Sequence, residues 1–313
     1  MGVTCLYETV QDAADRIGRL EVQGARNVAI AAIKAITEGA KQSKSKQKTV
    51  FLKELADAKT VLFASRETEP LMRNAIRHVI YAVEKSDETS VSNLVDLVSQ
   101  VSSTFLESLK KSKEKIALVG SKRVSDGSKV LTHCHSSTVT NMLMRAKAEG
   151  KSFEVICTES RPVFQGRITA REMLDAGIKT TMIVDSAVRY FMNDVDLVVV
   201  GADAITSEGN VINKIGTSMV ALAAKEARTP FYVASELLKF DPATVHGDYE
   251  TIEERSTTEV WKDPPLGLSI RNPAFDVTRR EFIHGIISEE GVVSPDSVGE
   301  LISRKYPWIF EAT

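Results

Sequence analysis

KVLTHCHSSTVTNMLMRAKAEG, residues 129–150, contains in order an apolar run, a polar turn and an amphipathic stretch. A short apolar run predicts a buried strand, and apolar residues at three- and four-residue spacing predict a helix. The hydroxyl side chains at 136–138 are placed to cap that helix at its start. This succession of strand, turn and helix sets the pattern for the second half of the chain.

The same alternation continues beyond residue 150. Further short apolar runs are EVICT (154–158), TTMIVD (180–185), DLVVV (196–200) and PFYVA (230–234). Strands that alternate with helices predict a mostly parallel sheet wound by helices on both faces. We therefore expect an α/β fold, with a Rossmann-like catalytic domain over residues 119–313.

The first part of the chain has a different period. Apolar residues recur there at helical spacing, for example at Val91, Leu94, Leu97, Val98 and Val101. This spacing predicts a helical N-terminal domain over residues 1–118. Two polar stretches without periodicity, 41–49 and 85–90, are expected to be loops between helices.

Composition excludes several classes of protein. The 313 residues are 43% hydrophobic, which is enough for a sizeable core. With 40 basic and 42 acidic residues intermixed, the net charge of −2 offers no broad field for nucleic acid or an anionic membrane. The three cysteines, at positions 5, 134 and 157, have no paired spacing, which argues against a disulfide framework and a zinc site. No apolar run reaches membrane-spanning length and the start does not look like a signal peptide, so we expect a cytoplasmic protein.

Polar residues gather just beyond the predicted strands. In doubly wound sheets the carboxyl ends of the strands hold the ligand. The turns concerned are HCHSS (133–137), ESRPVFQG (159–166), DSAV (185–188), GADAI (201–205) and SELLKF (235–240). The candidate site is expected at this edge of the sheet.

Cys134 is the first candidate reactive residue. It lies between a strand and the start of a helix, where unpaired amides favour a thiolate and lower the thiol pKa. The alternative is a buried structural cysteine, the commoner fate of an isolated thiol. His133 and His135 flank it, but neighbours on an extended strand point to opposite faces, so a metal site of all three residues is not expected.

Asp203 is the second candidate. It follows a fully apolar strand, where partial desolvation raises a carboxyl pKa and suits it to donate a proton. An aspartate that only caps a turn is an equally good interpretation of this residue alone. Ten residues later, Asn213 and Lys214 precede a Gly-containing turn and a helix. We expect the Lys214 ammonium and the backbone amides at the start of that helix to bind an anion.

Basic residues stand at other turns, at Arg66, Arg161 and Lys239. Each alone is more often a surface charge, but several near one edge suit a substrate with more than one phosphate. The sequence lacks both GxxxxGK[ST] and GxGxxG, so nucleotide-driven and nicotinamide chemistry receive no support.

The motifs at these positions resemble one protein family. They are THCHSS, TESRPVFQGRITAREMLDAG, VDSAVRYFM, VVVGADAIT, GNVINKIGTSMVALAAKEAR and NPAFDVT. The chain resembles the family that unites ribose-1,5-bisphosphate isomerases, methylthioribose-1-phosphate isomerases and the regulatory subunits of initiation factor two B. The resemblance covers the whole chain and is strongest from about 128 to 287, where the motifs are most similar to the archaeal ribose-bisphosphate isomerases.

The resemblance implies an activity and a set of site residues. Cys134 would be the proton acceptor and Asp203 the proton donor of an aldose–ketose isomerase that forms ribulose 1,5-bisphosphate during nucleoside-monophosphate (AMP) degradation. The implied substrate-binding residues are Gln23, Gly24, Ala25, Arg26, Arg66, Ser136, Ser137, Thr138, Asn213, Lys214 and Lys239. No metal or organic cofactor is implied, and the expected assembly is a homo-oligomer, either a dimer or a hexamer.

Two stretches depart from the family pattern. The isomerases commonly have Arg-Gly-Ala-Gly where this chain has Gln23-Gly24-Ala25-Arg26, so Arg26 is the candidate replacement for the usual arginine. Residues 66–78 also differ from the Arg-Pro-Thr pattern of relatives. Two alternatives stay open: a regulatory initiation-factor subunit, against which the pair Cys134 and Asp203 weighs, and a methylthioribose-1-phosphate isomerase.

Overall fold

The structure is a computed structural model that describes residues 5–66, 68–247 and 252–311. The chain forms two compact units, the first from residues 1–110, 238–242 and 300–313 and the second from 111–237 and 243–299. The division falls within one long helix, α5 (Val91–Ser121). The expected division at residues 118 and 119 lies in the same helix, and the independence of the two expected domains stays a prediction.

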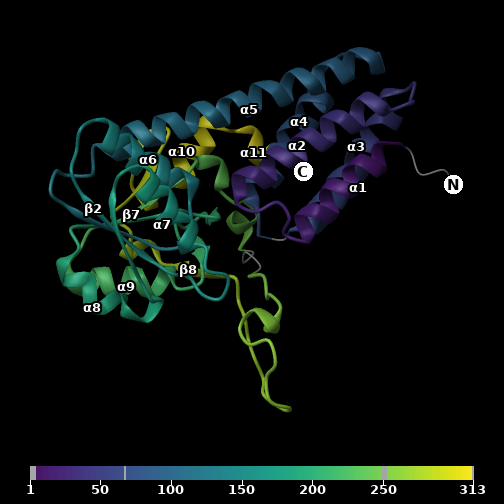
Figure 1. The fold of residues 1–313 in the computed structure, drawn as a ribbon. Coiled ribbons are helices and arrows are strands. Elements are labelled where there is room, and N and C mark those ends of the chain that lie inside the picture. Colours follow the sequence, from purple (N-terminus) through teal and green to yellow (C-terminus); the bar gives the residue numbers. More distant parts are fainter. Residues whose placement is uncertain (1–4, 67, 248–251, 312–313) are drawn as a thin grey trace. The chain divides into compact units, whose positions relative to one another are not determined.

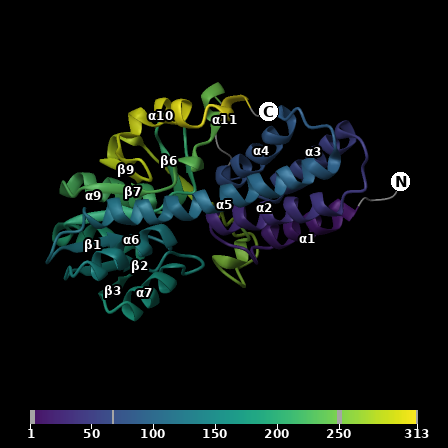
Figure 2. The same cartoon turned by 90° about the horizontal axis from the view of Figure 1, so that it is seen from above.

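The first unit is helical, as the apolar period predicts. It contains α1 (Cys5–Gly18), α2 (Ala25–Gln42), α3 (Lys48–Ser65), α4 (Pro70–Lys85), the first part of α5 and, near the end of the chain, α11 (Trp308–Glu311). Buried side chains on α2 and α4, among them Val28, Ile36 and Ile76, supply its core, and Figure 2 shows α1 and α2 side by side. Helices α2 and α3 are separated by 43–47 and α4 and α5 by 86–90, which confirms both predicted loops.

The second unit is built on a seven-stranded sheet. Its strands, in spatial order, are β10 (Gly291–Val293), β9 (Gly285–Ser288), β7 (Phe231–Ala234), β4 (Leu197–Val200), β1 (Lys129–Thr132), β2 (Glu154–Thr158) and β3 (Lys179–Ile183). Every neighbouring pair is parallel except β9 and β10. The predicted α/β fold class and all five predicted strands are confirmed.

Helices cover this sheet on both faces. In Figure 1, α6 (Ser137–Ala148) and α7 (Gly166–Asp175) lie on one side, and α8 (Val188–Phe191) and α9 (Thr217–Ala227) on the other. The end of α5, α6 and α7 bury a cluster that includes Ile116, Met142 and Met173 against strand residues such as Val155 and Val199. All four residues of β4 are buried, as expected of a strand covered on both faces.

The sequence did not predict a second, smaller sheet. Strands β5 (Ala204–Ile205), β6 (Val211–Lys214) and β8 (Phe275–Thr278) pair antiparallel in the order β5-β6-β8. The chain enters this sheet directly from the turn after β4, and α10 (Val298–Lys305) follows the last strands. Among the described helices, none is long and apolar enough to cross a membrane.

The strand order determines where a ligand site is expected. From β1 the chain proceeds outward to β2 and β3, and then returns to place β4 on the other side of β1. This reversal is a topological switch point, beside which the carboxyl ends of adjacent strands leave a crevice. Cys134 follows β1 and Asp203 follows β4, so both candidates lie at the switch point.

Candidate active site

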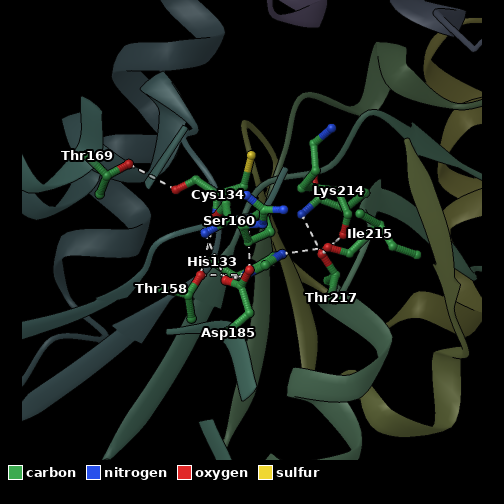
Figure 3. Close-up of polar contacts among 12 residues, drawn as sticks. His133, Cys134, Thr158, Ser160, Thr169, Asp185, Lys214, Ile215 and Thr217 are labelled. Atoms are coloured by element: carbon green, nitrogen blue, oxygen red, sulfur yellow. Dashed lines mark hydrogen bonds and ion pairs between the residues drawn. The ribbon is translucent and has the colours of Figure 1, made fainter. Parts of the chain in front are cut away.

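Cys134 occupies a strained position at the end of β1. Its φ is +67°, in the left-handed region that is costly for a residue other than glycine. Its backbone N–H donates to Oγ of Ser160 at 2.8 Å, and its carbonyl accepts from Oγ1 of Thr169 at 2.9 Å. The side chain is half-buried, and in Figure 3 the sulfur of Cys134 and the ammonium of Lys214 extend to the same side.

The helix after Cys134 begins as the sequence predicts. Ser136 is the N-cap of α6, and its hydroxyl accepts from the N–H of Val139 at 3.5 Å. Ser136 also packs against Gly201, where an added β-carbon would lie 2.7 Å from the Ser136 hydroxyl. Only glycine therefore allows the turn after β4 to come this close to the start of α6.

Asp203 lies in that same turn, half-buried. Its backbone N–H donates to the carbonyl of Ile212 at 2.8 Å, which joins the turn to β6. The carboxylate is close enough to Cys134 to raise the pKa of the thiol by electrostatic repulsion. The two candidate reactive residues follow the adjacent strands β1 and β4, and the charge of Asp203 acts on the thiol of Cys134.

Lys214 is a buried cation beside this pair. It ends β6, is 6% exposed and places its ammonium 5.1 Å from the centre of the Phe275 ring. In the part of the chain that the structure describes, no carboxylate forms a salt bridge with it. Its neighbour Asn213 donates to the hydroxyl of Thr217 at 3.0 Å. A buried lysine that faces a ring is available for an anionic ligand.

Three backbone amides of the turn after Lys214 already have protein acceptors. The carboxylate of Asp276 accepts from the N–H of Gly216 at 2.7 Å and from the N–H and hydroxyl of Ser218. The N–H of Ile215 donates to the carbonyl of Ala274. Because protein acceptors already occupy these three amides, they are not offered to an anion near this turn, whereas the lysine side chain is.

The two histidines beside Cys134 have separate partners. His133 is buried, with Nδ1 2.6 Å from Oγ1 of Thr158 and Nε2 2.9 Å from the carbonyl of Ile215. His135 places Nδ1 3.2 Å from Oγ1 of Thr169 and Nε2 3.8 Å from Glu172. Burial lowers the pKa of both imidazoles. They are therefore neutral at pH 7 and act as hydrogen-bonding groups.

The charge state of Cys134 differs from the sequence expectation. Burial raises the pKa of the thiol to about 11, opposed by the nearby Lys214 ammonium and reinforced by Asp203 and Asp185. The expectation of a lowered thiol pKa was wrong, because it weighed the start of the helix and omitted desolvation. Cys134 therefore holds its proton at neutral pH.

Ser137 and Thr138 lie in the first turn of α6, and the remaining predicted binding residues belong to the first unit. Arg66 is 8% exposed and its guanidinium lies 3.3 Å from Glu69, while Lys239 is 6% exposed. Gln23 donates to the carbonyl of Leu20 at 3.1 Å. Arg26, the candidate replacement for the family's usual arginine, donates to the carbonyl of Leu109 at 2.7 Å. The α2 N-cap Gly24 has φ +84° and Ala25 begins the helix. Their grouping with Cys134 stays a prediction.

Three residues that contact the Cys134 segment were not singled out by the sequence: Ser160, Thr169 and Asp185. Ser160 and Asp185 lie in the turns after β2 and β3, which the sequence did mark as polar turns at strand ends. Nothing in the sequence shows which residue of such a turn faces inward. At the turn after β2, the backbone takes a positive φ at Ser160, +60°, which the residue types alone do not indicate.

Comparisons with known proteins agree on one family. Residues 21–295 match the model of the initiation factor 2 subunit family. A protein of Archaeoglobus fulgidus named ribose 1,5-bisphosphate isomerase is 43% identical over 301 residues, 95% of this chain and 94% of that protein. One of Methanocaldococcus jannaschii with the same name is 38% identical, covering 96% and 97%.

More distant relatives carry other names. A methylthioribose-1-phosphate isomerase of Pelotomaculum thermopropionicum is 33% identical over 91% of this chain and 82% of its own length. Among solved structures, a Pyrococcus horikoshii protein described as translation initiation factor eIF-2B superposes with a TM-score of 0.80 at 30% identity, covering 92% of this chain and 98% of that one. The relatives of this chain therefore carry both isomerase and translation initiation factor names.

Proposed function

The chain belongs to the initiation factor 2 subunit family, and we propose that within it this protein is an aldose–ketose isomerase that converts ribose 1,5-bisphosphate to ribulose 1,5-bisphosphate. The observation that carries the proposal is the position of Cys134 and Asp203 at the switch point, close enough to interact electrostatically. The archaeal relatives at 38–43% identity bear the name of this activity.

The reaction needs an acid and a base on opposite parts of the sugar. Phosphate on carbon 1 prevents the ring from opening spontaneously to an aldehyde. An acid must protonate the ring oxygen, and a base must remove the proton from carbon 2 to give an enol phosphate. Reprotonation at carbon 1 and loss of the hydroxyl proton at carbon 2 complete the ketone.

We assign the base to Cys134 and the acid to Asp203. The pair needs one proton in total: a thiolate with a carboxylic acid reacts, and a thiol with a carboxylate is the resting form. The raised pKa of the thiol supports that resting form. After ring opening the Asp203 carboxylate recovers its proton from the carbon 2 hydroxyl, and the thiol returns its proton to carbon 1. The scheme requires no metal or organic cofactor.

Two groups of the second unit suit a phosphate. Ser136–Thr138 form the start of α6, where backbone amides and the helix dipole favour an anion. Lys214 supplies a buried positive charge. Gln23–Arg26, Arg66, Lys239 and Asn213 remain proposed substrate-binding residues on the resemblance to the family.

A product assay decides among the three members of the family. The purified protein is incubated separately with ribose 1,5-bisphosphate and methylthioribose 1-phosphate, and the products are followed by NMR. We expect turnover of the bisphosphate only. Turnover of the methylthio sugar alone would assign the other isomerase, and inactivity on both, with tight binding to initiation factor two, would assign a regulatory subunit. We further propose a cytoplasmic homo-oligomer, a dimer or hexamer, which sedimentation can test.

A further inference from the structure

The backbone at Cys134 is held from both sides by hydroxyl groups. Ser160 accepts from the N–H of Cys134 and Thr169 donates to its carbonyl. A left-handed conformation at a residue with a side chain persists only where the surroundings enforce it. These two hydrogen bonds join the peptides on either side of the strained residue to the turn after β2 and to α7.

Ser160 is itself in a left-handed conformation, with φ +60°. The carboxylate of Asp185 holds it there by accepting from the N–H of Ser160 at 2.8 Å and from the N–H of Arg161 at 2.7 Å. Cys134, Ser160 and Asp185 follow β1, β2 and β3, three neighbouring parallel strands. Asp185 after β3 therefore holds the backbone of Ser160 after β2, and Ser160 in turn holds the backbone of Cys134 after β1.

The donor and the acceptor of each hydrogen bond around Ser160 can be assigned in only one consistent way. The carbonyl of Ile215 can only accept, so Nε2 of His133 donates to it and Nδ1 accepts in the neutral ring. Thr158 then donates to Nδ1 at 2.6 Å, and Ser160 donates to Thr158 at 3.2 Å. The Ser160 oxygen is left to accept from the N–H of Cys134. Burial, which lowers the pKa of His133, keeps the ring in the neutral form that this direction requires.

This directed series connects both sides of the candidate site. It runs from the turn that carries Lys214 and Ile215, through the buried His133, Thr158 and Ser160, to the Cys134 amide, as Figure 3 shows. Ser160 and Thr158 are fully buried, so water cannot replace a lost partner without entering the core. The network leaves the sulfur of Cys134 outside it, on the side of Lys214.

We propose that Ser160 is a positioning residue that holds Cys134 in its reactive conformation, and that Asp185 holds Ser160 in turn. Ser160 does not touch the substrate in this proposal. Its hydroxyl fixes the φ of Cys134 and thereby the direction of the thiol. The proposal rests on the proposed function insofar as Cys134 acts as the base, but the geometry of the thiol can be tested without turnover.

The test compares Ser160→Ala and Ser160→Gly with a matched control, Ser288→Ala. Ser288 is also a fully buried serine whose hydroxyl donates to one backbone group, the Gly291 carbonyl, and accepts from another, the N–H of Glu290. Glycine suits the φ of residue 160, so the second variant removes the hydroxyl without adding backbone strain. Circular dichroism verifies the fold of each variant.

Two measurements are made on each variant. Turnover should fall by about 10- to 100-fold in both Ser160 variants, with KM within about threefold of the wild type, since binding groups are untouched. Alkylation of Cys134 by iodoacetamide at pH 8, located by peptide mass spectrometry, should become about threefold faster or more, because a released thiol is better solvated and its pKa falls. Ser288→Ala should change neither quantity.

Unchanged alkylation of Cys134 in the folded Ser160 variants overturns the proposal, whatever happens to turnover. If the wild type turns over neither sugar phosphate, the proposed function fails, but the alkylation comparison still decides whether Ser160 positions the thiol. Should Ser160→Ala fail to fold, Ser160→Gly carries the same comparison, and a faster reaction of Cys134 in it supports the proposal.

Discussion

His133 packs so closely against Gly216 that a β-carbon added at residue 216 would lie 3.1 Å from Cε1 and Nε2 of the imidazole. This contact joins the end of β1, which carries Cys134, to the turn between β6 and α9, which follows Lys214. Gly216 also has φ +101°, a conformation that other residues rarely adopt. Two independent reasons therefore require glycine at this position.

Replacing Gly216 by alanine should destabilise the protein by roughly 2–4 kcal/mol, from backbone strain and the contact with His133 together. The matched control is Gly177→Ala, since Gly177 has φ +70° but nothing within 4 Å of an added β-carbon. Strain alone should cost about 1–2 kcal/mol there. Urea unfolding of both variants measures the difference, and equal losses would show that the imidazole contact does not matter.

Cys134→Ser should retain the fold and lose turnover by roughly 10²–10⁴-fold, the usual contribution of a positioned base. A hydroxyl is far less acidic than a thiol, so the serine cannot form the anion that removes the carbon 2 proton. Cys157→Ala is the control, because it removes a thiol from the apolar core behind the sheet; its turnover should stay within about threefold. Near-normal turnover of folded Cys134→Ser would exclude the thiol from the mechanism.

How far the sequence predicts this molecule depends on how local each feature is. The five predicted strands are recovered because each is a short apolar run, and the Ser136 cap because its signal spans four residues. β6 was missed because its sequence, VINK, ends in a polar and a charged residue, which are buried here by the pairing of β6 with β8.

The environment of the candidate site is less predictable for the same reason. The amides after Lys214 are capped by Asp276, far along the chain, and Cys134 is held by Ser160 and Thr169 from separate elements. The switch point itself follows from the strand order, which a single sequence does not give. Residue types could be assigned from the sequence, but their hydrogen-bond partners and the thiol pKa depend on tertiary packing.

The electrostatic surroundings of Cys134 predict opposite effects of two substitutions. Lys214 lowers the pKa of the thiol and Asp203 raises it. At pH 9, below the thiol pKa of about 11, the alkylation rate follows the thiolate fraction. Lys214→Met should therefore raise the pKa and slow alkylation, whereas Asp203→Asn should lower the pKa and accelerate it, each by about threefold or more.

Peptide mass spectrometry of the alkylated protein measures both rates. Lys225→Met, an exposed lysine on α9, should leave the rate unchanged and controls for net charge. The wild-type rate should rise by about tenfold per pH unit between pH 8 and 10, since the thiol remains mostly protonated there. Changes of the same sign in Lys214→Met and Asp203→Asn would contradict the assigned electrostatics.

Lys214→Ala and Lys239→Ala should weaken binding of ribose 1,5-bisphosphate by about tenfold each, because each removes a charge-assisted contact to phosphate. The loss should shrink as salt is added, since screening weakens the same contact in the wild type. Calorimetric titration at two salt concentrations, with Lys225→Ala as the control, provides the measurement. Unchanged affinity in both variants would mean that the phosphates are bound elsewhere.

Asp203→Asn should separate binding from turnover. The amide has nearly the same shape and keeps hydrogen bonding, but it has no proton that it can transfer to the ring oxygen. Affinity for the bisphosphate should stay within about threefold, while turnover falls by roughly 10²–10⁴-fold. Asp194→Asn, at an exposed aspartate after α8, is the matched control and should retain both.

A crystal structure of Asp203→Asn soaked with ribose 1,5-bisphosphate then gives the geometry. We expect the unreacted sugar, with carbon 2 facing the sulfur of Cys134 and the ring oxygen facing residue 203. The reverse orientation would exchange the acid and base assignments, because the residue nearest carbon 2 must accept its proton. A regulatory subunit predicts that the wild type and Asp203→Asn are equally inactive. The proposed isomerase instead requires that the wild type turn over the same sugar that the variant only binds.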